Sequence, residues 1–510
     1  MVHSTLGELL DAGDDQAVAL AAPERPPLSY AGLRILVAGT RSVLNRAGIG
    51  REDRIAIVLP NGPEMAAAFV AIGASATTAP LNPGYRAEEF EFYLNDLGAR
   101  ALVVMEDSDS PALAVAGRLG IPVIPLAVPA DAPAGTFTLQ AAANPARQPL
   151  GEDFRDGPAE ADDVALVLHT SGTTSRPKIV PLSQRNLCAS AGHIRDTLAL
   201  IPADRCLNIM PLFHIHGLMA AVLASLSAGA SVFCTPGFNA LRVFAWMTEA
   251  GPTWYTAVPT MHQAILARAA RHRDQMPPLR FIRSSSSSLP PQVMRDLEAT
   301  FQAPVIESYG MTEAAHQMAS NPLPPGARKP GSVGLSAGPE MAILDPAGNR
   351  LGADEVGEIA IRGPNVTAGY QNNPQANAEA FSNGWFRTGD QGKTDSDGYF
   401  YITGRLKEII NRGGEKISPR EVDEVLLDHP AVAQALTFAM PHPKLGEEVA
   451  AAIVLREGET VDERTLRAFV GERLADFKVP RKILFLEEIP KGATGKLQRI
   501  GLAEKLGVSG

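Results

Sequence analysis

The chain has 510 residues, of which 45% are hydrophobic and 20% are charged, as in an ordinary soluble globular protein. Its net charge is -10 and no basic stripe is visible, which argues against a nucleic-acid-binding protein. The three cysteines, Cys188, Cys206 and Cys234, show no CxxC spacing. A disulfide framework or a structural zinc site is therefore not expected.

Targeting and membrane signals are the next features to consider. Residues 1–5 lack the charged and apolar regions of a signal peptide. The most apolar stretches, 65–74 and 218–230, are too short or too interrupted to cross a bilayer. We therefore expect a cytoplasmic protein without a membrane span, and no sequence feature indicates an obligate protein partner.

Short apolar runs alternate with helical patterns through residues 30–250. The runs 54–59, 101–105 and 164–168 predict strands. Strands that alternate with helices are typical of an α/β domain. The sequence therefore predicts a large α/β domain in the amino-terminal part of the chain.

The last hundred residues have a different pattern. The segment 418–421, Ser-Pro-Arg-Glu, predicts a helix that begins with a capping box and has proline at its first position. The runs 432–438 and 449–455 predict strands. These elements indicate an α+β domain.

Charge is distributed unevenly between the two parts. Residues 405–510 hold 17 basic and 17 acidic side chains, so the net negative charge belongs to the rest of the chain. We predict a large domain over residues 1–403 and a smaller domain over residues 404–510.

A hydroxyl-rich loop follows the predicted strand 164–168. It runs Thr170-Ser171-Gly172-Thr173-Thr174-Ser175-Arg176-Pro177-Lys178. Backbone N–H groups and hydroxyls in such a loop can donate to phosphate oxygens, and a lysine adds a positive charge. The spacing is not that of the common P-loop. From these residues alone, a polyphosphate-binding loop and a Ser/Thr-rich surface turn both stay open.

The loop 170–178 resembles the phosphate loop of the acyl-adenylate-forming enzymes, which include acyl-CoA synthetases, peptide-synthetase adenylation domains and firefly-type luciferases. Four further segments are similar to motifs of that family and follow in the same order: 307–313 (ESYGMTE), 384–390 (GWFRTGD), 404–416 (GRLKEIINRGGEK) and 490–496 (PKGATGK). The chain departs from the commonest pattern at Ser175 and Ile179, which are often glycine in the family. Neither departure removes a catalytic group.

The resemblance implies a fold and a two-step reaction. The expected fold is a large N-terminal α/β domain that binds AMP and the acid, with a smaller, mobile α+β lid at the carboxyl end. In the first step a carboxylate attacks the α-phosphate of ATP and releases pyrophosphate. In the second step a thiol, usually that of coenzyme A, displaces AMP. The resemblance therefore implies ATP, Mg²⁺ and coenzyme A as co-substrates or cofactor.

The resemblance also assigns roles around the nucleotide. Phosphate binding falls to the loop residues Thr170, Ser171, Gly172, Thr173, Thr174 and Lys178. Tyr309 would stack on adenine, and Thr312 would donate to the α-phosphate. Glu313 would be the metal ligand, since an oxygen donor suits Mg²⁺. Asp390 and Arg405 would hydrogen-bond the ribose hydroxyls.

Three further assignments concern the lid. Lys496, in its glycine-bounded turn, would bridge the substrate carboxylate and the α-phosphate during adenylation. Lys407 would be the hinge about which the lid rotates between the two steps. Gly413 and Gly414 would then lie along the pantetheine tunnel.

Serine and histidine residues are the candidates for the acid site. His214 and His216 lie two residues apart, so in an extended segment they would share one side. A run of serines covers 284–288, and His316 follows Glu313 by three residues. A fatty-acid tunnel would be lined by apolar groups, whereas these residues suggest a small polar pocket that could meet a second carboxylate. The two histidines also raise a metal site, but no third cysteine or carboxylate ligand lies nearby in the sequence.

A narrower resemblance points to one acid. The segments 254–260, 280–284, 312–316 and 320–322 look like those of the oxalate-activating branch of the family, the oxalyl-CoA synthetases of plants and yeast. We therefore predict an ATP- and Mg²⁺-dependent acid–CoA ligase that acts on oxalate.

The same resemblance implies that Ser286 and His316 hold the distal carboxylate and that His214 lines the pocket. The register within the serine run stays open. The alternatives are a CoA ligase for another short or medium-chain acid and a free-standing adenylation enzyme that loads a carrier protein. A regulator that binds adenylate without catalysis is disfavoured because Lys496 and Glu313 are both present.

Overall fold

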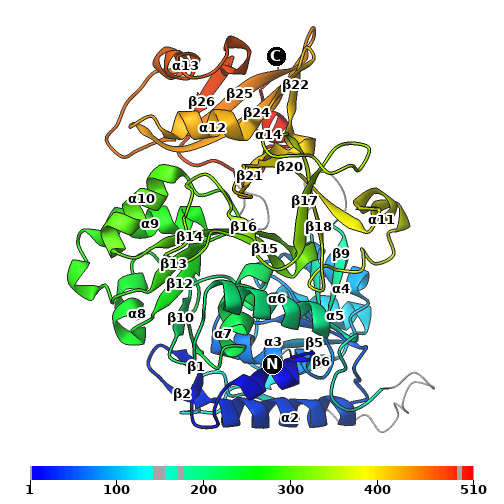
Figure 1. The fold of residues 1–510 in the computed structure, drawn as a ribbon. Coiled ribbons are helices and arrows are strands. Elements are labelled where there is room, and N and C mark those ends of the chain that lie inside the picture. The colour runs from blue at the N-terminus through cyan, green and yellow to red at the C-terminus, as the bar shows by residue number, and fades with distance from the viewer. Residues whose placement is uncertain (1–2, 142–154, 171–176, 491–496, 509–510) are drawn as a thin grey trace. The chain divides into compact units, whose positions relative to one another are not determined.

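The structure, a computed structural model, describes residues 3–141, 155–170, 177–490 and 497–508. The chain forms two compact units (Figure 1). The large unit comprises residues 1–170, 178–340 and 362–377. The small unit comprises residues 171–177, 341–361 and 378–510. The predicted boundary between residues 403 and 404 stays a prediction.

The first sheet of the large unit has nine strands in the order β16-β15-β14-β13-β12-β10-β11-β1-β2. Strands β14, β13, β12, β10, β11 and β1 run parallel, and the remaining three pair antiparallel at the edges. In sheet order the strands are Leu335–Ser336, His316–Ser320, Val305–Met311, Phe281–Ser284, Trp254–Ala257, Arg205–Asn208, Ser231–Cys234, Val18–Ala22 and Arg25–Ser29.

The second sheet of the large unit has seven strands in the order β7-β6-β5-β3-β4-β8-β9. In sheet order they are Thr138–Leu139, Val123–Ala127, Ala101–Met105, Arg54–Val58, Thr77–Pro80, Val164–His169 and Ile179–Ser183. Strands β6, β5, β3, β4 and β8 run parallel. The three strands predicted from apolar runs are β3, β5 and β8, so the predicted α/β class of this part is confirmed.

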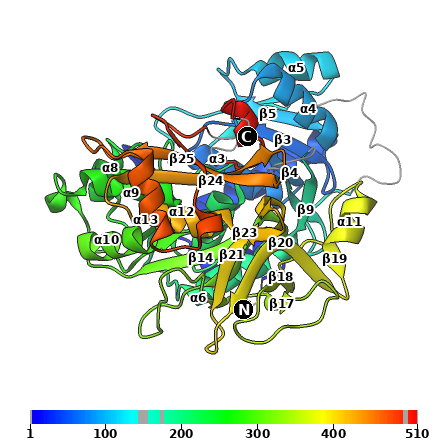
Figure 2. The same cartoon turned by 90° about the horizontal axis from the view of Figure 1, so that it is seen from above.

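Helices cover the faces of these sheets. They are α1 Leu6–Leu9, α2 Tyr30–Arg46, α3 Pro63–Gly73, α4 Ala87–Leu97, α5 Pro111–Leu119, α6 Gln184–Thr197, α7 Ala224–Leu226, α8 Val243–Ala250, α9 Pro259–Ala269 and α10 Pro291–Phe301. A further helix, α11 Pro374–Ala380, contains the residue boundary between the two units. Helix α5 shows how the sequence sets an element's ends. The Ser110 hydroxyl accepts from the Ala112 N–H, Pro111 occupies the first turn, and Gly120 ends the helix with a φ of 65°. Figure 2 shows α4 and α5 side by side.

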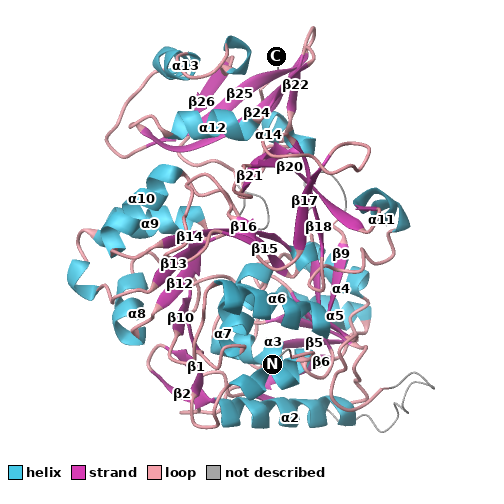
Figure 3. Ribbon diagram, viewed as in Figure 1, coloured by secondary structure: helices cyan, strands magenta, loops and turns pink. Residues whose placement is uncertain are grey.

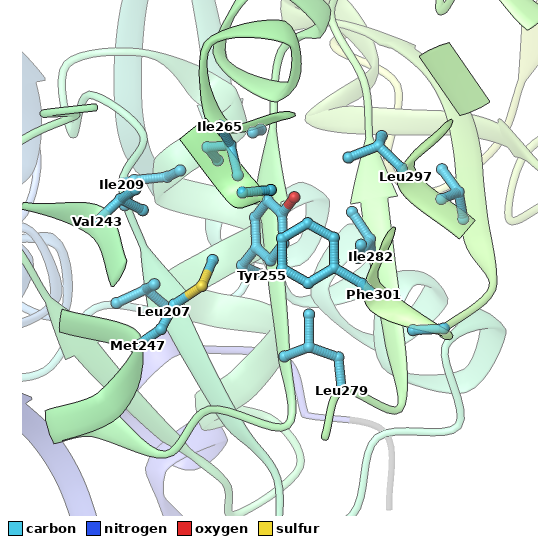
Figure 4. Close-up of a cluster of buried hydrophobic side chains, with 14 of the residues drawn as sticks. Leu207, Ile209, Val243, Met247, Tyr255, Ile265, Leu279, Ile282, Leu297 and Phe301 are labelled. Atoms are coloured by element: carbon cyan, nitrogen blue, oxygen red, sulfur yellow. The ribbon is translucent and has the colours of Figure 1, made fainter. Parts of the chain in front are cut away.

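Helices α8, α9 and α10 lie along one side of strands β10, β12, β13 and β14 (Figure 3). The core between them is drawn in Figure 4, where the rings of Tyr255 and Phe301 lie with centroids 6.2 Å apart. Fully buried aliphatic side chains such as Leu207, Ile265 and Leu297 surround them. This core fixes the strands whose carboxyl ends carry the candidate site.

The apolar stretch 65–74 forms most of helix α3, whose Met65–Gly73 side chains are all buried. A helix that is apolar all round belongs in a protein core. Across the described ranges, no helix is both long enough and apolar enough to cross a membrane.

The small unit contains two five-stranded sheets. One has the order β17-β18-β20-β19, with β21 paired to β20, and comprises Glu340–Leu344, Gly357–Arg362, Trp385–Thr394, Phe381–Ser382 and Phe400–Arg405. The other has the order β23-β22-β25-β24, with β26 paired to β25, and comprises Glu415–Ile417, Ile410–Arg412, Gly446–Leu455, Val432–His442 and Lys482–Phe485. The helices are α12 Pro419–Leu427, α13 Glu463–Gly471 and α14 Leu502–Lys505. The strands predicted over 432–438 and 449–455 are confirmed.

The predicted capping box at helix α12 is wrong, although the helix begins with Pro419 as expected. The Ser418 hydroxyl makes no cap hydrogen bond and instead donates to the Thr403 carbonyl oxygen. The Glu421 carboxylate pairs with Lys478 at 2.7 Å. Tertiary partners therefore take both side chains that the local pattern assigned to the cap.

Candidate active site

The candidate acid site lies where parallel strands of the nine-stranded sheet end. In open α/β sheets, ligands bind outside the carboxyl ends of the strands. Polar side chains gather at this edge from four neighbouring strands: His216 after β10, Thr256 on β12, Arg283 on β13, Ser286 after β13, and His316 with Gln317 at the start of β15 after β14. We call these six residues the polar cluster.

His316 is placed by a tight turn between β14 and β15. Ala315 and His316 have positive φ angles of 46° and 97°, in a region that L residues rarely adopt. The Asn365 amide donates to the Ala314 carbonyl oxygen at 2.8 Å and so fixes the turn. A Cβ at Gly310 would lie 1.7 Å from the His316 carbonyl oxygen, so only glycine permits this close approach.

The segment that carries the two neighbouring histidines is not extended. A π-helix spans His216–Leu223, and Ile215 already has helical angles, so the expectation that both histidines share one side of an extended segment is wrong. His216 is buried, with its ring centroid 4.9 Å from that of His316. His214 is half-buried and contacts the ring of Phe213. The pocket-lining role of His214 stays a prediction.

Hydrogen bonds connect the polar cluster. His216 Nδ1 lies 2.9 Å from Ser286 Oγ, and His216 Nε2 lies 2.6 Å from Thr256 Oγ1. Arg283 Nη1 lies 3.2 Å from His316 Nε2 and 3.4 Å from His216 Nε2. The structure therefore brings the predicted pair Ser286 and His316 into one network, through His216, a candidate histidine that was given no role, and Arg283, which was not predicted as a site residue.

Arg283 is the charged group of the polar cluster. Its side chain is fully buried, and its hydrogen-bond partners among the described residues are His216, Thr256, His316 and Gln317, none of which is a carboxylate. Burial lowers the pKa of the guanidinium to about 9, so it remains charged at neutral pH. Such a charge is costly to bury without a partner. Sequence reasoning missed Arg283 as a site residue, although a lone arginine in a buried apolar strand was a signal.

The predicted phosphate loop joins strands β8 and β9, which pair antiparallel. The two ends of the loop are bonded to each other. The Thr170 N–H donates to the Lys178 carbonyl oxygen at 2.9 Å, and the Lys178 N–H donates to Thr170 Oγ1 at 3.1 Å. The predicted phosphate-binding residues between them, Ser171, Gly172, Thr173 and Thr174, lie outside the described residues.

The predicted metal ligand lies in a short 3₁₀ turn, Thr312–Ala314. Glu313 is buried, and its Oε1 accepts a 2.7 Å hydrogen bond from the Tyr370 hydroxyl. The Lys178 ammonium lies 4.3 Å from the centroid of the same tyrosine ring. A positioned carboxylate fits Mg²⁺, which takes one or two protein oxygens and completes its shell with phosphates and water. Tyr309 on β14 is also buried.

The remaining predicted residues belong to the small unit. The Arg405 Nε donates to Asp390 Oδ1 at 2.8 Å, and these residues are register partners on β20 and β21. Lys407 is exposed. Gly413 and Gly414 form the two-residue turn between β22 and β23, with φ angles of 59° and 103° that favour glycine. Lys496 lies outside the described residues.

Comparison with known protein families identifies the fold. Residues 11–371 match the family model of AMP-binding enzymes. The chain belongs to the AMP-binding enzyme family. Residues 421–496 match the C-terminal domain of the same enzymes. The predicted large α/β domain with a separate C-terminal domain is therefore confirmed for this AMP-binding enzyme.

Similar proteins indicate which reaction this member of the family catalyses. The chain is 47% identical over 487 residues to an oxalate–CoA ligase of Arabidopsis thaliana, covering 94% of each protein. It is 42% identical over 473 residues to an oxalate–CoA ligase of Saccharomyces cerevisiae, covering 89% of this chain and 87% of that protein. The crystal structure of ATP-bound MatB from Rhodopseudomonas palustris matches with a TM-score of 0.88 and 30% identity over 98% of both chains. This AMP-binding enzyme is an acid–CoA ligase that binds ATP and works through an acyl-adenylate.

Proposed function

We propose that this ligase activates oxalate and produces oxalyl-CoA, AMP and pyrophosphate. The observation that carries the proposal is the polar cluster, in which hydrogen bonds connect Ser286, His216 and His316 with a fully buried, charged Arg283. The names of the Arabidopsis and yeast relatives support the same acid.

The polar cluster favours a second anionic group on the substrate. Oxalate carries two adjacent carboxylates, so when one reacts at the α-phosphate the other lies within a few ångströms of it. That second charge must be met by hydrogen-bond donors and positive charge, because an unpaired buried charge is costly. An alkyl tail would satisfy none of these donors, and a site built around polar groups discriminates strongly against a ligand that leaves them unpaired.

The reaction has two substitution steps, adenylation and thioester formation, and in each step one bond forms while another breaks. A carboxylate oxygen attacks the α-phosphorus, and the bond from that phosphorus to the bridging oxygen breaks as pyrophosphate leaves. The coenzyme A sulfur then attacks the carbonyl carbon, and the bond from that carbon to the phosphate-linked oxygen breaks as AMP leaves. The protein's task is to position the reactants and to balance charge at phosphorus.

Residues of the large unit are proposed to hold the nucleotide. Lys178 and the loop that starts at Thr170 would bind phosphate oxygens, Tyr309 would stack on adenine, and Thr312 would donate to the α-phosphate. Glu313 would hold Mg²⁺, which when bound supplies positive charge to the phosphate oxygens.

Residues of the small unit are proposed to complete the reaction. Asp390 and Arg405 would bind the ribose, and Lys496 would bridge the attacking carboxylate and the α-phosphate. Lys407 would act as the hinge of a mobile lid, and the Gly413–Gly414 turn would face the pantetheine arm in the second step.

A panel of acids tests the proposal. We expect the wild-type enzyme to show its highest kcat/KM with oxalate among oxalate, malonate, acetate and hexanoate. His316→Ala should lower kcat/KM for oxalate about ten- to a hundredfold, since a hydrogen bond to a charged group contributes about 1.5–3 kcal/mol. Acetate has no second carboxylate for His316 to hold, so its kcat/KM should change much less.

Two outcomes would contradict the proposal. A wild-type preference for hexanoate would indicate a ligase for medium-chain acids. Efficient transfer to a phosphopantetheinyl carrier protein with no transfer to free coenzyme A would indicate an adenylation enzyme that loads a carrier.

A further inference from the structure

We propose that Arg283 is a positioning residue that sets the direction of hydrogen-bond donation through both imidazoles of the polar cluster. It makes His216 and His316 accept at Nε2 and donate at Nδ1, so that the donors are directed away from the buried guanidinium. This inference rests on the proposed function, because the donors so directed are those that would meet the distal carboxylate of oxalate.

The guanidinium of Arg283 can only donate hydrogen bonds to the two histidine rings. All its polar hydrogens are donors and it has no acceptor. Its Nη1 lies 3.2 Å from His316 Nε2 and 3.4 Å from His216 Nε2. A hydrogen on either Nε2 would place two donors against each other. Both Nε2 atoms therefore accept, and the ring protons belong on Nδ1.

The tautomer of His216 also sets the direction of the hydrogen bond between His216 and Ser286. The single lone pair of His216 Nε2 takes the nearer donor, the Thr256 hydroxyl at 2.6 Å, and Thr256 Oγ1 in turn accepts from Arg283 Nη1 at 3.5 Å. His216 Nδ1–H then donates to Ser286 Oγ across the 2.9 Å contact. The hydroxyl hydrogen of Ser286 must therefore point away from His216. Ser286 also has a φ of 71°, a strained conformation of the kind found where a side chain is held for function.

The charge of Arg283 has a second effect on the two rings. A positive charge this close disfavours a further positive charge on either imidazole. The positive charge that attracts a dianion therefore resides on the guanidinium next to the two rings. The guanidinium is fully buried, and its Nη2 donates to Gln317 Oε1 at 3.3 Å. Arg283 therefore acts through His216 and His316.

An arginine that only stabilised the fold would have a different set of partners. Buried charges that stabilise a fold are paired and fully hydrogen-bonded. The hydrogen-bond partners of Arg283 among the described residues include no carboxylate, and its buried Nε has no hydrogen-bond partner there. Such an arrangement lowers stability, and proteins retain such arrangements where function requires them.

The primary test is the tautomeric state of the rings in the full-length protein without substrate. Long-range ¹H–¹⁵N spectra of histidine-labelled protein distinguish Nδ1–H from Nε2–H rings, and His216→Gln and His316→Gln assign the two signals. We expect Nδ1–H in the wild type for both rings. In Arg283→Met, at least one ring should shift to Nε2–H or to the protonated form. Unchanged ring states in Arg283→Met would overturn the proposal.

Kinetics and stability provide the second test. Arg283→Met should lower kcat/KM for oxalate about a hundredfold, change that for acetate less than about threefold, and keep or raise the thermal midpoint. Its oxalate activity, relative to wild type, should rise as pH falls from 8 to 6, because a protonated imidazole then replaces the lost charge. Arg283→Lys, which keeps a charge, should recover part of the oxalate activity.

The outcomes separate this inference from the proposed function. Equal loss for all acids together with a lower thermal midpoint would show a packing role and overturn the inference. A wild-type preference for hexanoate would reject oxalate as the substrate, while the ring spectra would still decide whether Arg283 sets the tautomers.

Discussion

Tyr370 connects two groups that the sequence motifs place at the nucleotide. Its hydroxyl donates to Glu313 Oε1 at 2.7 Å, and its ring contacts the Lys178 ammonium. Tyr370→Phe keeps the ring but removes the hydroxyl. We expect acid-dependent ATP–pyrophosphate exchange to fall about tenfold and to require more Mg²⁺, since a hydrogen bond to a carboxylate contributes about 1.5–3 kcal/mol.

The matched control is Tyr401→Phe, which removes a 3.3 Å hydroxyl–carboxylate bond to Asp395 in the small unit. This variant should keep both the exchange rate and its Mg²⁺ dependence. If Tyr370→Phe leaves the Mg²⁺ titration unchanged, Tyr370 does not position Glu313.

Residue pairs of this kind mark the limit of what the sequence could predict. Tyr309, Thr312 and Glu313 lie in one contiguous motif, so resemblance alone could assign them roles. Tyr370 is 57 residues from Glu313, and Arg283 is 33 residues from His316. These partners meet only because the folded chain brings distant segments together, so the sequence did not connect Tyr370 with Glu313 or Arg283 with His316.

The β14–β15 hairpin is the element that places His316. Gly310→Ala would bring a methyl group to 1.7 Å from the His316 carbonyl oxygen, so one of the two strands must shift. Forced packing of this kind costs about 1–3 kcal/mol or more. We expect a lower free energy of unfolding and a loss of oxalate activity beyond that of acetate, measured by urea denaturation and by kcat/KM.

Gly39→Ala is the control for this substitution. Gly39 lies within helix α2, and an added Cβ there would meet no atom within 4 Å. Alanine is favoured over glycine in a helix by up to about 1 kcal/mol, so this variant should be equally or more stable. The hairpin account would be contradicted if Gly310→Ala were as stable and active as Gly39→Ala.

Helices and strands were predicted correctly where no tertiary contact competed with the local sequence pattern. The apolar runs of β3, β5 and β8 needed only burial to become strands. The capping box at α12 failed because Ser418 donates to Thr403 instead. The extended His214–His216 segment failed because the chain forms a π-helix from His216, a local structure with no simple residue pattern.

The stability of the whole molecule should depend on pH through His262. This side chain is fully buried, and burial lowers its pKa from 6.5 to about 3. The unfolded chain takes up a proton below pH 6.5, whereas the folded protein does so only near pH 3. His262 therefore contributes stability above pH 6.5 that is lost progressively as the pH falls toward 3.

Between pH 7 and pH 5 this loss amounts to about 2 kcal/mol. His262→Phe, which keeps an aromatic ring at the site, should lack that component. Urea denaturation at both pH values measures it, and the comparison uses the change with pH within each protein because the variant also loses the 3.2 Å contact to Tyr255 Oη. Equal pH dependence of the two proteins would show that His262 titrates normally when folded.

For the molecule as a whole, the sequence predicted both the family and the fold. Five motifs in the family's order cover the chain from Thr170 to Lys496, and the family and fold they imply are confirmed. Three points stay predictions because each depends on a bound ligand or on a movement of the chain: the roles of the site residues, the binding of Mg²⁺ and the mobile lid. The domain boundary also stays a prediction.

The transfer of oxygen from oxalate to AMP tests the central claim most directly. With ¹⁸O-labelled oxalate, ATP and coenzyme A, the acyl-adenylate route leaves one carboxylate oxygen on phosphorus when the thiol displaces AMP. We predict oxalyl-CoA, unlabelled pyrophosphate and AMP that carries one ¹⁸O atom, all detected by mass spectrometry. Unlabelled AMP, or ADP with labelled phosphate, would contradict the account.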